Sequence, residues 1–425
     1  MILALTIFLL TYALMLALSK YRHIIALVSA ALFVALGVLP VGKILPAIDF
    51  NVILMLAGTM AIVSLFIESN MPQRIADALL ARTKNVCWAI VSLALFAGAI
   101  SAFVDNVATT LIVAPVGLAI SKKLKIPPVP VLIAIAVSSN LQGAATLVGD
   151  TTSILLGGYA ELDFLDFFAT RGKPGIFWAV EFGALATVPV LYFIFRKYRD
   201  SVPEQKPADV SDYFPSVLLI GLVALLICAS FIPDKPAITN GLICMALGLA
   251  GTVRAMMRRG AGALGRVVRE IDYVTLLLLA GLFIVIAGIT EAGVIVAIGD
   301  LFINLSAGNV FVIYTLIVFG SVLFSAFIDN IPYVFTMLPV VELISGELGT
   351  ANPENVKMLL FFGLLSGATL GGNLTPIGAS ANITAIGILR REGYEVRVRD
   401  FMKIGVPFSL AAVLVGYIFI WFVWR

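Results

Sequence analysis

The chain has 425 residues, of which 61% are hydrophobic and only 12% are charged, and its mean hydropathy is +1.07. A soluble globular protein of this length does not have this composition, so the sequence predicts an all-α polytopic membrane protein in the lipid bilayer. The net charge of +3 says little by itself, because in a membrane protein the distribution of Lys and Arg between the loops matters more than their sum. We expect no nucleic-acid partner.

Apolar runs of roughly 17 to 25 residues are long enough to cross the hydrocarbon core of a bilayer. The sequence predicts about ten such transmembrane helices, near 2–19, 23–40, 51–69, 131–157, 175–195, 214–232, 237–253, 272–290, 357–388 and 404–424. The first run lacks a basic start and a small-residue cleavage site, so we expect a retained span and not a signal peptide. Cys87, Cys228 and Cys244 have no pairing or metal-ligand spacing, so we expect no disulfide, no zinc site and no cofactor.

Two further apolar stretches, 87–120 and 309–340, each carry an aspartate near the middle. The surrounding sequence is Ser-Ala-Phe-Val-Asp-Asn at 101–106 and Ser-Ala-Phe-Ile-Asp-Asn at 325–330. A carboxylate near the bilayer midplane costs roughly 2.5–3.5 kcal/mol on insertion scales, which indicates an ion or substrate site. Arms of about 15 residues reach about 22 Å, less than the hydrocarbon thickness of about 30 Å, so each stretch predicts a re-entrant hairpin. Two ordinary short spans are the alternative to each hairpin.

The charged residues of the loops predict the orientation of the chain. Basic residues flank the first hairpin on both sides, while acidic residues flank the second. The first hairpin is therefore expected to enter from the cytoplasm and the second from outside. In this topology 22 of the 28 basic residues are cytoplasmic, with both termini outside the cell (plasma) membrane.

The two halves of the chain have the same polar residues and glycines at equivalent positions, separated by a nearly constant number of residues. At an offset of 223, Asp49, Gly58 and Glu68 match Asp272, Gly281 and Glu291. Each half would have five crossings and one hairpin, and an odd number of crossings turns the second half upside down. We therefore expect two inverted-topology repeats, 1–196 and 214–425, joined by a cytoplasmic linker at 197–213.

After each hairpin comes a span interrupted by small and polar residues, at 131–157 and at 357–388. Both spans contain Gly-x-x-Thr-x-x-Gly, beginning at Gly143 and at Gly372. Backbone of this kind does not remain a regular helix in lipid, and it is tolerated only where it is buried in protein or lines a wet cavity. The sequence thus predicts two broken helices that form the wall of a site between the hairpin tips.

The chemistry of such a site follows from the ends of the broken helices, whose N–H groups attract anions and whose carbonyls bind cations. Asp105 and Asp329 are expected either to carry protons, since burial favours the neutral carboxyl, or to hold Na⁺ together with Asn106 and Asn330. The alternative is that each aspartate only caps a hairpin helix. The full expected substrate- or ion-binding set is Asp105, Asn106, Thr109, Thr110, Asn140, Thr146, Asp150, Asp329, Asn330, Asn373, Thr375, Ser380 and Asn382.

Asp150 stands apart from the other candidates in this set. In the second half Ala379 occupies the matching position, so the symmetry between the halves is broken there. Asp150 is either a second carboxylate of the site or a residue near its edge.

These motifs resemble those of a known superfamily. Asp-Asn-Val-Ala-Thr-Thr at 105–110, with Pro115 five residues later, is similar to the Ser-Asn-Thr-Ala-Thr-Thr hairpin of divalent-anion/sodium symporters, and nearly the whole chain resembles the ion transporter superfamily. The paired Ser-Ala-Phe-x-Asp-Asn motifs and Ile-Gly-Ala-Ser-Ala-Asn at 377–382 are most similar to its arsenite-permease, P-protein and D-type sodium/proton antiporter branch, which has a citrate-transporter-like domain.

This resemblance implies a scaffold and a transport domain, usually in a homodimer, with an elevator-like motion of the site. Asp105 and Asp329 stand where the sodium/dicarboxylate motif has serines, which favours proton coupling. We therefore expect a secondary active transporter and not an enzyme. The leading hypothesis is proton-coupled efflux of a metalloid or small inorganic anion, such as arsenite or antimonite. The coupling ion is H⁺ or Na⁺.

Other functions stay open at this point. A sodium/proton antiporter and a sodium-coupled organic-anion carrier, for dicarboxylate or citrate, are the alternatives. An intramembrane aspartyl protease is the least favoured, because the sequence before Asp150 lacks the first glycine of Gly-x-Gly-Asp. There is no Gly-x-x-x-x-Gly-Lys-Ser/Thr loop, so ATP-driven transport would need a partner ATPase.

Overall fold

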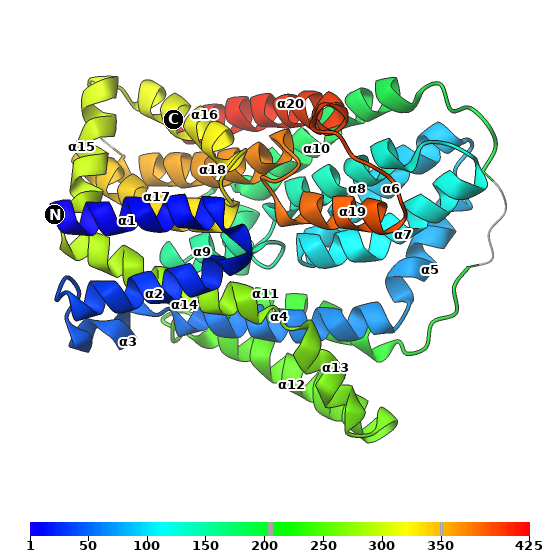
Figure 1. Cartoon of the computed structure of the whole chain (residues 1–425), viewed down its shortest axis with the longest axis horizontal. Helices are drawn as coiled ribbons and strands as arrows, with labels where there is room; N and C mark the ends of the chain where they lie inside the picture. The colour runs from blue at the N-terminus through cyan, green and yellow to red at the C-terminus, as the bar shows by residue number, and fades with distance from the viewer. Residues whose placement is uncertain (203–206, 349, 351) are drawn as a thin grey trace.

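The computed structural model describes residues 1–202, 207–348, 350 and 352–425, and residues 203–206 of the predicted linker lie outside this part (Figure 1). The first half contains α1 (Ile2–Ala17), η1 (Ser19–Tyr21), α2 (Arg22–Ala35), η2 (Val41–Lys43), α3 (Ile44–Ala47), α4 (Phe50–Glu68), α5 (Met71–Leu80), α6 (Val86–Ser101), α7 (Asn106–Lys123), α8 (Pro128–Gly143), α9 (Thr151–Tyr159), η3 (Phe164–Phe167) and α10 (Ile176–Phe195). Between η3 and α10, β1 (Ala169–Thr170) pairs antiparallel with β2 (Lys173–Pro174).

Within the described residues, the second half contains ten α-helices, as the first half does. It contains α11 (Phe214–Ala229), α12 (Thr239–Arg259), α13 (Gly262–Glu270), α14 (Tyr273–Glu291), α15 (Val294–Ser306), α16 (Val310–Ser325), α17 (Asn330–Glu347), α18 (Pro353–Gly371), η4 (Gly372–Leu374), α19 (Ser380–Arg391) and α20 (Val398–Trp424). The predicted all-α polytopic class is confirmed.

Length and hydropathy identify the spans only in part. Within the described residues, six helices are long and apolar enough to cross a membrane, or seven if the bent pair α15 and α16 forms one span. Five shorter apolar helices, α1, α2, α6, α8 and α11, accompany them. The total of about ten spans therefore stays a prediction.

Most predicted boundaries lie within a few residues of the observed ones, with three larger differences. Helix α12 continues to Arg259, six residues beyond the predicted end, and α20 begins at Val398, six residues before the predicted start. Helix α17 ends at Glu347, seven residues beyond the predicted end of the second hairpin. The extensions are charged, so a search for apolar runs stops short of them.

The two predicted hairpins are present as helix pairs, α6 with α7 and α16 with α17. Each pair is interrupted at its aspartate motif, because Asp105 and Asp329 begin the second helix of the pair as N-caps. Figure 1 shows α5, α6 and α7 at one end of the molecule and α15, α16 and α17 at the other. The two hairpins thus reach the middle of the protein from opposite ends. Both chain termini lie toward the end that carries α15 (Figure 1).

Matched glycines hold the helices of one half against those of the other. A Cβ atom on Gly281 of α14 would lie 2.7 Å from the carbonyl carbon of Ala26 in α2. A Cβ atom on Gly58 of α4 would overlap the carbonyl group of Cys244 in α12 in the same way. Small residues allow such close helix contacts in membranes. Interlocked helix pairs of this kind are what the predicted repeats, 1–196 and 214–425, would produce.

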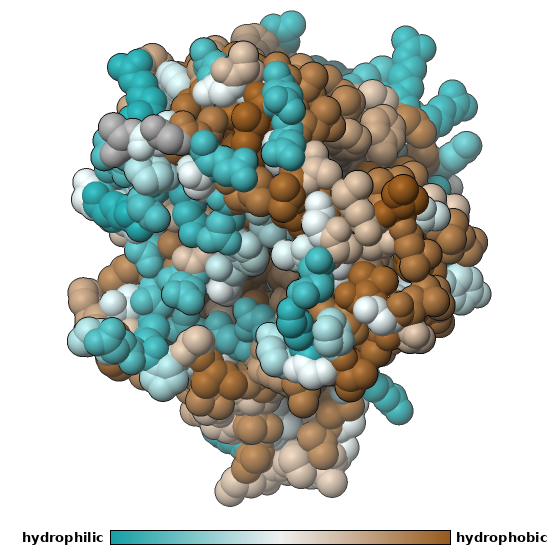
Figure 2. Space-filling view, turned by 90° about the vertical axis from the view of Figure 1, so that its left-hand side faces the viewer, coloured by the Kyte–Doolittle hydropathy of each residue, from teal (hydrophilic) through white to brown (hydrophobic). Residues whose placement is uncertain are grey.

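The surface separates into hydrophilic and hydrophobic areas. Figure 2 looks onto the end of the molecule that carries α15, where hydrophilic residues surround a hollow near the centre, while much of the rest is hydrophobic. A cavity of about 590 Å³ lies toward this end, between the N-terminus of α4 and the C-terminus of α14. Asp49, Tyr159 and Glu291 are among the residues that line it.

Candidate functional site

A second cavity, of about 510 Å³, lies toward the opposite end of α4 and α14. Its wall is formed by the C-terminal half of α4, the N-termini of α7, α9 and α14, and the segment that leads into α2. We call it the site cavity. Five predicted site residues line it: Asp105, Asn106, Asp150, Asn330 and Ser380.

The tip of the first hairpin places a partly free carboxylate in the site cavity. One oxygen of Asp105, Oδ2, accepts hydrogen bonds from the backbone N–H of Val107, at 2.9 Å, and of Ala108, at 3.1 Å. The other oxygen, Oδ1, has no donor among the described residues. Asp105 is therefore a helix cap, as the alternative interpretation expected, but it keeps one oxygen available to a proton or a ligand.

The tip of the second hairpin is built differently. Oδ1 of Asp329 accepts the backbone N–H of Ile331 at 3.1 Å, and Oδ2 forms an ion pair with the guanidinium of Arg22. Asp329 does not line the site cavity, whereas Arg22 does. The sequence gives the two aspartates the same role, and the structure places them in unlike surroundings.

The broken helices begin again at the site cavity. Asp150 caps α9 by accepting the backbone N–H of Thr151 at 2.7 Å, and it also accepts the hydroxyl of Thr152 at 3.0 Å. The side-chain amide of Asn330, from the opposite hairpin, lies 3.5 Å from the same carboxylate. Asp150 therefore lines the same cavity as Asp105. The N-termini of α7 and α9 both point their positive dipoles toward this space.

A chain of buried asparagines connects the two halves behind the cavity. Asn106 donates to Oδ1 of Asn140 at 2.9 Å, and Asn140 donates to Oδ1 of Asn373 at 3.1 Å. Asn140 also donates to the carbonyl of Thr369 at 2.7 Å, and Asn373 donates to that of Val137 at 2.9 Å. Asn140 and Asn373 are fully buried and do not line the cavity, so their contacts fix the position of the hairpin tip.

We expect Asn140→Ala to lower the free energy of unfolding by about 1–3 kcal/mol, because it leaves Asn106 and Asn373 with buried, unpaired amide groups. Thermal unfolding of the detergent-solubilised protein checks this. Asn304→Ala is the matched control, because Asn304 is exposed on α15. Equal melting temperatures for the two variants would contradict the structural role of the asparagine chain.

Thr146 and Thr375, which occupy matching positions in the two halves, connect the broken helices to the hairpins by hydrogen bonds. Thr146 donates its hydroxyl hydrogen to the carbonyl of Ala102, and Thr375 donates to that of Ala326. Thr109 and Thr110 donate to carbonyls of their own hairpin, and Asn382 donates to the carbonyls of Gly372 and Thr375. The structure thus places these five predicted residues in the support of the site and not on the cavity wall.

Four charged residues of the site cavity are missing from the expected set. They are Lys20, Arg22, Glu270 and Asp272. The two basic residues fall in the short loop between the first two predicted spans, and the packing of α2 against α14 brings this loop to the cavity wall. The match of Asp272 with Asp49 at the offset of 223 residues could have identified Asp272 as a candidate. Among the described residues, no group of three or more His, Cys, Asp or Glu side chains is arranged to hold a metal ion.

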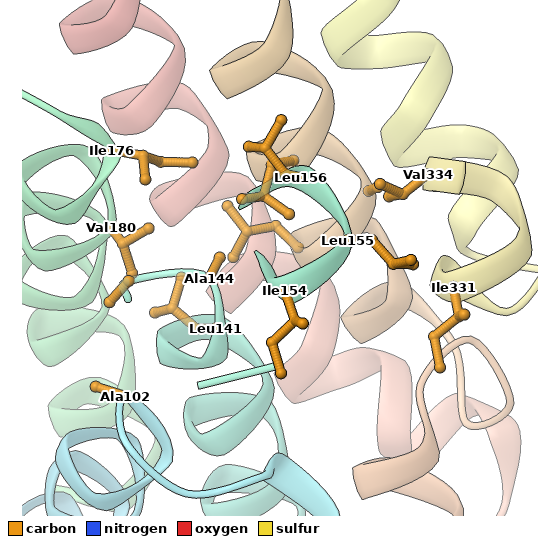
Figure 3. Packing of buried hydrophobic residues seen from close by; sticks show 14 of the residues in the cluster. Ala102, Leu141, Ala144, Ile154, Leu155, Leu156, Ile176, Val180, Ile331 and Val334 are labelled. Carbon is orange, nitrogen blue, oxygen red and sulfur yellow. The ribbon is translucent and has the colours of Figure 1, made fainter. Parts of the chain in front are cut away.

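An apolar wall separates the two cavities. Ile154 of α9 and Ile331 of α17 line the site cavity, while their neighbours Leu155 and Phe335 line the cavity at the other end. Figure 3 shows Ile154, Leu155, Ile331 and Val334 in this region of the core, where α9 and α17 pack together. Asp105 and Asp150 therefore lie on the site-cavity side of this wall.

Helical hairpins that meet broken helices, with carboxylates at their tips, define a membrane transporter fold. The family model of citrate transporters (CitMHS) matches residues 8–362, and the chain belongs to this family. It is therefore a multi-pass membrane protein and a secondary transporter, and the expected membership in the ion transporter superfamily is confirmed.

Individual relatives agree with this family. An uncharacterized transporter of Mycobacterium tuberculosis is 30% identical over 429 residues, which cover 99% of this chain and 98% of the relative. The P protein of Homo sapiens is 26% identical over 87% of this chain and 53% of its own length. The crystal structure of the YdaH transporter of Alcanivorax borkumensis has a TM-score of 0.58 and 13% identity, over 95% of this chain and 97% of that one, which shows a common fold.

Proposed function

We propose that the protein couples the efflux of a small metalloid or inorganic anion, of the arsenite or antimonite type, to the opposite movement of protons. The strongest support is that Asp105 and Asp150 line one cavity, and that Asp105 has an oxygen without a protein donor among the described residues. A carboxylate in such surroundings can exchange a proton with the solvent of the cavity each time the site turns over.

The lining of the site cavity suits a ligand rich in hydroxyl groups. Cys87, Cys228 and Cys244 are not among its lining residues, so a metalloid would bind as a hydroxide and not through thiolates. Asn106, Asn330 and Ser380 offer amide and hydroxyl groups to such a ligand. The helix N-termini at Asp105 and Asp150 add positive dipoles that favour a partial or full negative charge.

We propose an elevator-like motion of the hairpins and broken helices along α4 and α14, within a homodimer in the plasma membrane. The apolar side chains Leu56, Met60 and Val63 of α4 line the site cavity and offer a surface past which the hairpin can slide. With the predicted orientation, the site cavity faces the cytoplasm and the cavity near Asp49 faces outward. The wall of Ile154, Leu155 and their partners would then alternate between closing one side and closing the other.

A carrier of citrate or a related carboxylate is the second candidate. Two observations favour it. Lys20 brings positive charge to the wall of the site cavity, and the family to which the chain belongs is described as one of citrate transporters.

Reconstituted vesicles that contain a pH-sensitive dye distinguish these functions. We expect arsenite or antimonite gradients to drive proton movement through the protein, and citrate gradients to do so if the second candidate is correct. Proton movement that responds to Na⁺ gradients and to neither class of anion would contradict both candidates and favour sodium/proton antiport. Vesicles without protein are the control for leakage.

A further inference from the structure

The two hairpin tips occupy equivalent positions in the sequence repeat, but their carboxylates differ in what they can still bind. Asp105 lines the cavity and uses one oxygen as a helix cap, while its other oxygen has no donor among the described residues. Asp329 uses one oxygen as a helix cap, and the guanidinium of Arg22 takes the other. The side chains of this ion pair are only 20% and 22% exposed, so solvent screens their attraction little. The difference between the tips is the presence of a protein cation at one of them.

The position of Arg22 at the start of α2 is electrostatically unfavourable for a cation. It is the first residue of α2, where the helix dipole disfavours a positive charge. The other charged residues that line the site cavity are Lys20, Asp105, Asp150, Glu270 and Asp272. A guanidinium keeps its charge at every physiological pH, so an aspartate paired with it stays ionised and does not take up a proton.

The repeat suggests why Asp105 has no such partner among the described residues. Gly281 packs against the peptide between Ala26 and Leu27, and its counterpart Gly58 packs against the peptide between Cys244 and Met245, an offset of 218 residues. The same offset places Asn240 of α12 at the position equivalent to Arg22. Its neutral amide is directed at Asp163, 3.5 Å away. At the position equivalent to Arg22, the second half therefore has a neutral amide in place of a cation.

We propose that Arg22 is a built-in cation that occupies the ion position at the second hairpin tip, so that the Asp105 tip alone takes up a coupling proton. This rests on the proposed function, because it assumes that hairpin carboxylates carry the coupling ion. Arg22 then fixes the coupling at one proton per hairpin pair and acts as a residue that determines stoichiometry. Removing its charge would turn Asp329 into a second proton acceptor.

Infrared difference spectroscopy between neutral and acidic pH tests this on the purified full-length protein, because protonated carboxyl groups give a separate C=O band. The probe is the proton alone, so no substrate has to be known. We expect the wild-type band to lose a component in Asp105→Asn and to keep all components in Asp329→Asn. We expect Arg22→Gln to add one component, which the double variant Arg22→Gln/Asp329→Asn lacks. Arg22→Lys, which retains a cation, should add none.

The experiment distinguishes failure of the role of Arg22 from failure of the proposed function. A wild-type component that disappears in Asp329→Asn would overturn the role of Arg22, even if Arg22→Gln failed to fold. A folded Arg22→Gln protein without an added component would overturn it as well. The absence of any component that depends on Asp105 would instead contradict the proposed function, and with it the assignment of the coupling proton.

Discussion

Asp105→Asn is expected to reduce proton-driven substrate accumulation to the level of vesicles without protein, while the protein still folds. The amide cannot carry a proton in place of the carboxylate, so the coupling is lost. Asparagine is as good a helix cap as aspartate, and its side-chain oxygen can still accept the N–H groups of Val107 and Ala108. The loss should therefore appear in transport and not in the melting temperature. Uptake driven by an imposed pH gradient and thermal unfolding together check this.

Asp300→Asn is the matched control for the change of charge, because Asp300 is exposed on α15 and does not line the site cavity. It should accumulate substrate as the wild type does. Full accumulation by the Asp105→Asn protein would remove Asp105 from the mechanism and leave Asp150 as the remaining cavity carboxylate of the expected set.

The second large effect is on stability. We expect Gly58→Ala and Gly281→Ala each to destabilise the protein by about 1–3 kcal/mol, because the new methyl group forces two packed helices apart. At Gly281 the nearest atom is a backbone carbon of Ala26 at 2.7 Å, which cannot move without its helix. Gly221→Ala in α11 is the control, since nothing lies within 4 Å of a Cβ atom there. Alanine has a higher helix propensity than glycine, and a helix position with free space around it accepts the methyl group, so this control should melt at the same temperature or higher.

Comparable melting temperatures for Gly58→Ala and Gly221→Ala, measured in the same detergent, would contradict the close packing of α4 against α12. The stability losses at Gly58 and Gly281 can also be compared between the two halves. Similar losses at both positions would support the proposed repeats, because equivalent contacts should carry equivalent free energy.

The sequence predicts the features that depend on local pattern. Apolar length locates most spans, the aspartate motifs locate the breaks of both hairpins, and the offset of 223 residues identifies Gly58 and Gly281 as a pair before their contacts are known. The short helices α5, α13 and α15 are not predicted, because they are too short for a search that looks for runs of membrane length.

The sequence does not predict which polar residues face the cavity. Thr146 and Asp150 lie four residues apart in one break, yet Thr146 fastens the hairpin while Asp150 lines the site. Their directions depend on the packing of the hairpin against the break. The sequence also does not predict the ion-pair partner of Asp329, because Arg22 lies 307 residues away in the chain and resembles any other basic residue of a loop.

Accumulation of substrate under a pH gradient alone tests the proposed coupling most directly. Vesicles that contain the purified protein, with an acidic lumen and no Na⁺ on either side, are given external arsenite, antimonite or citrate. The account predicts that at least one of these anions accumulates inside above its external concentration, and that collapsing the pH gradient with a protonophore releases it. Accumulation that needs a Na⁺ gradient and ignores the pH gradient would contradict proton coupling through the hairpin carboxylate.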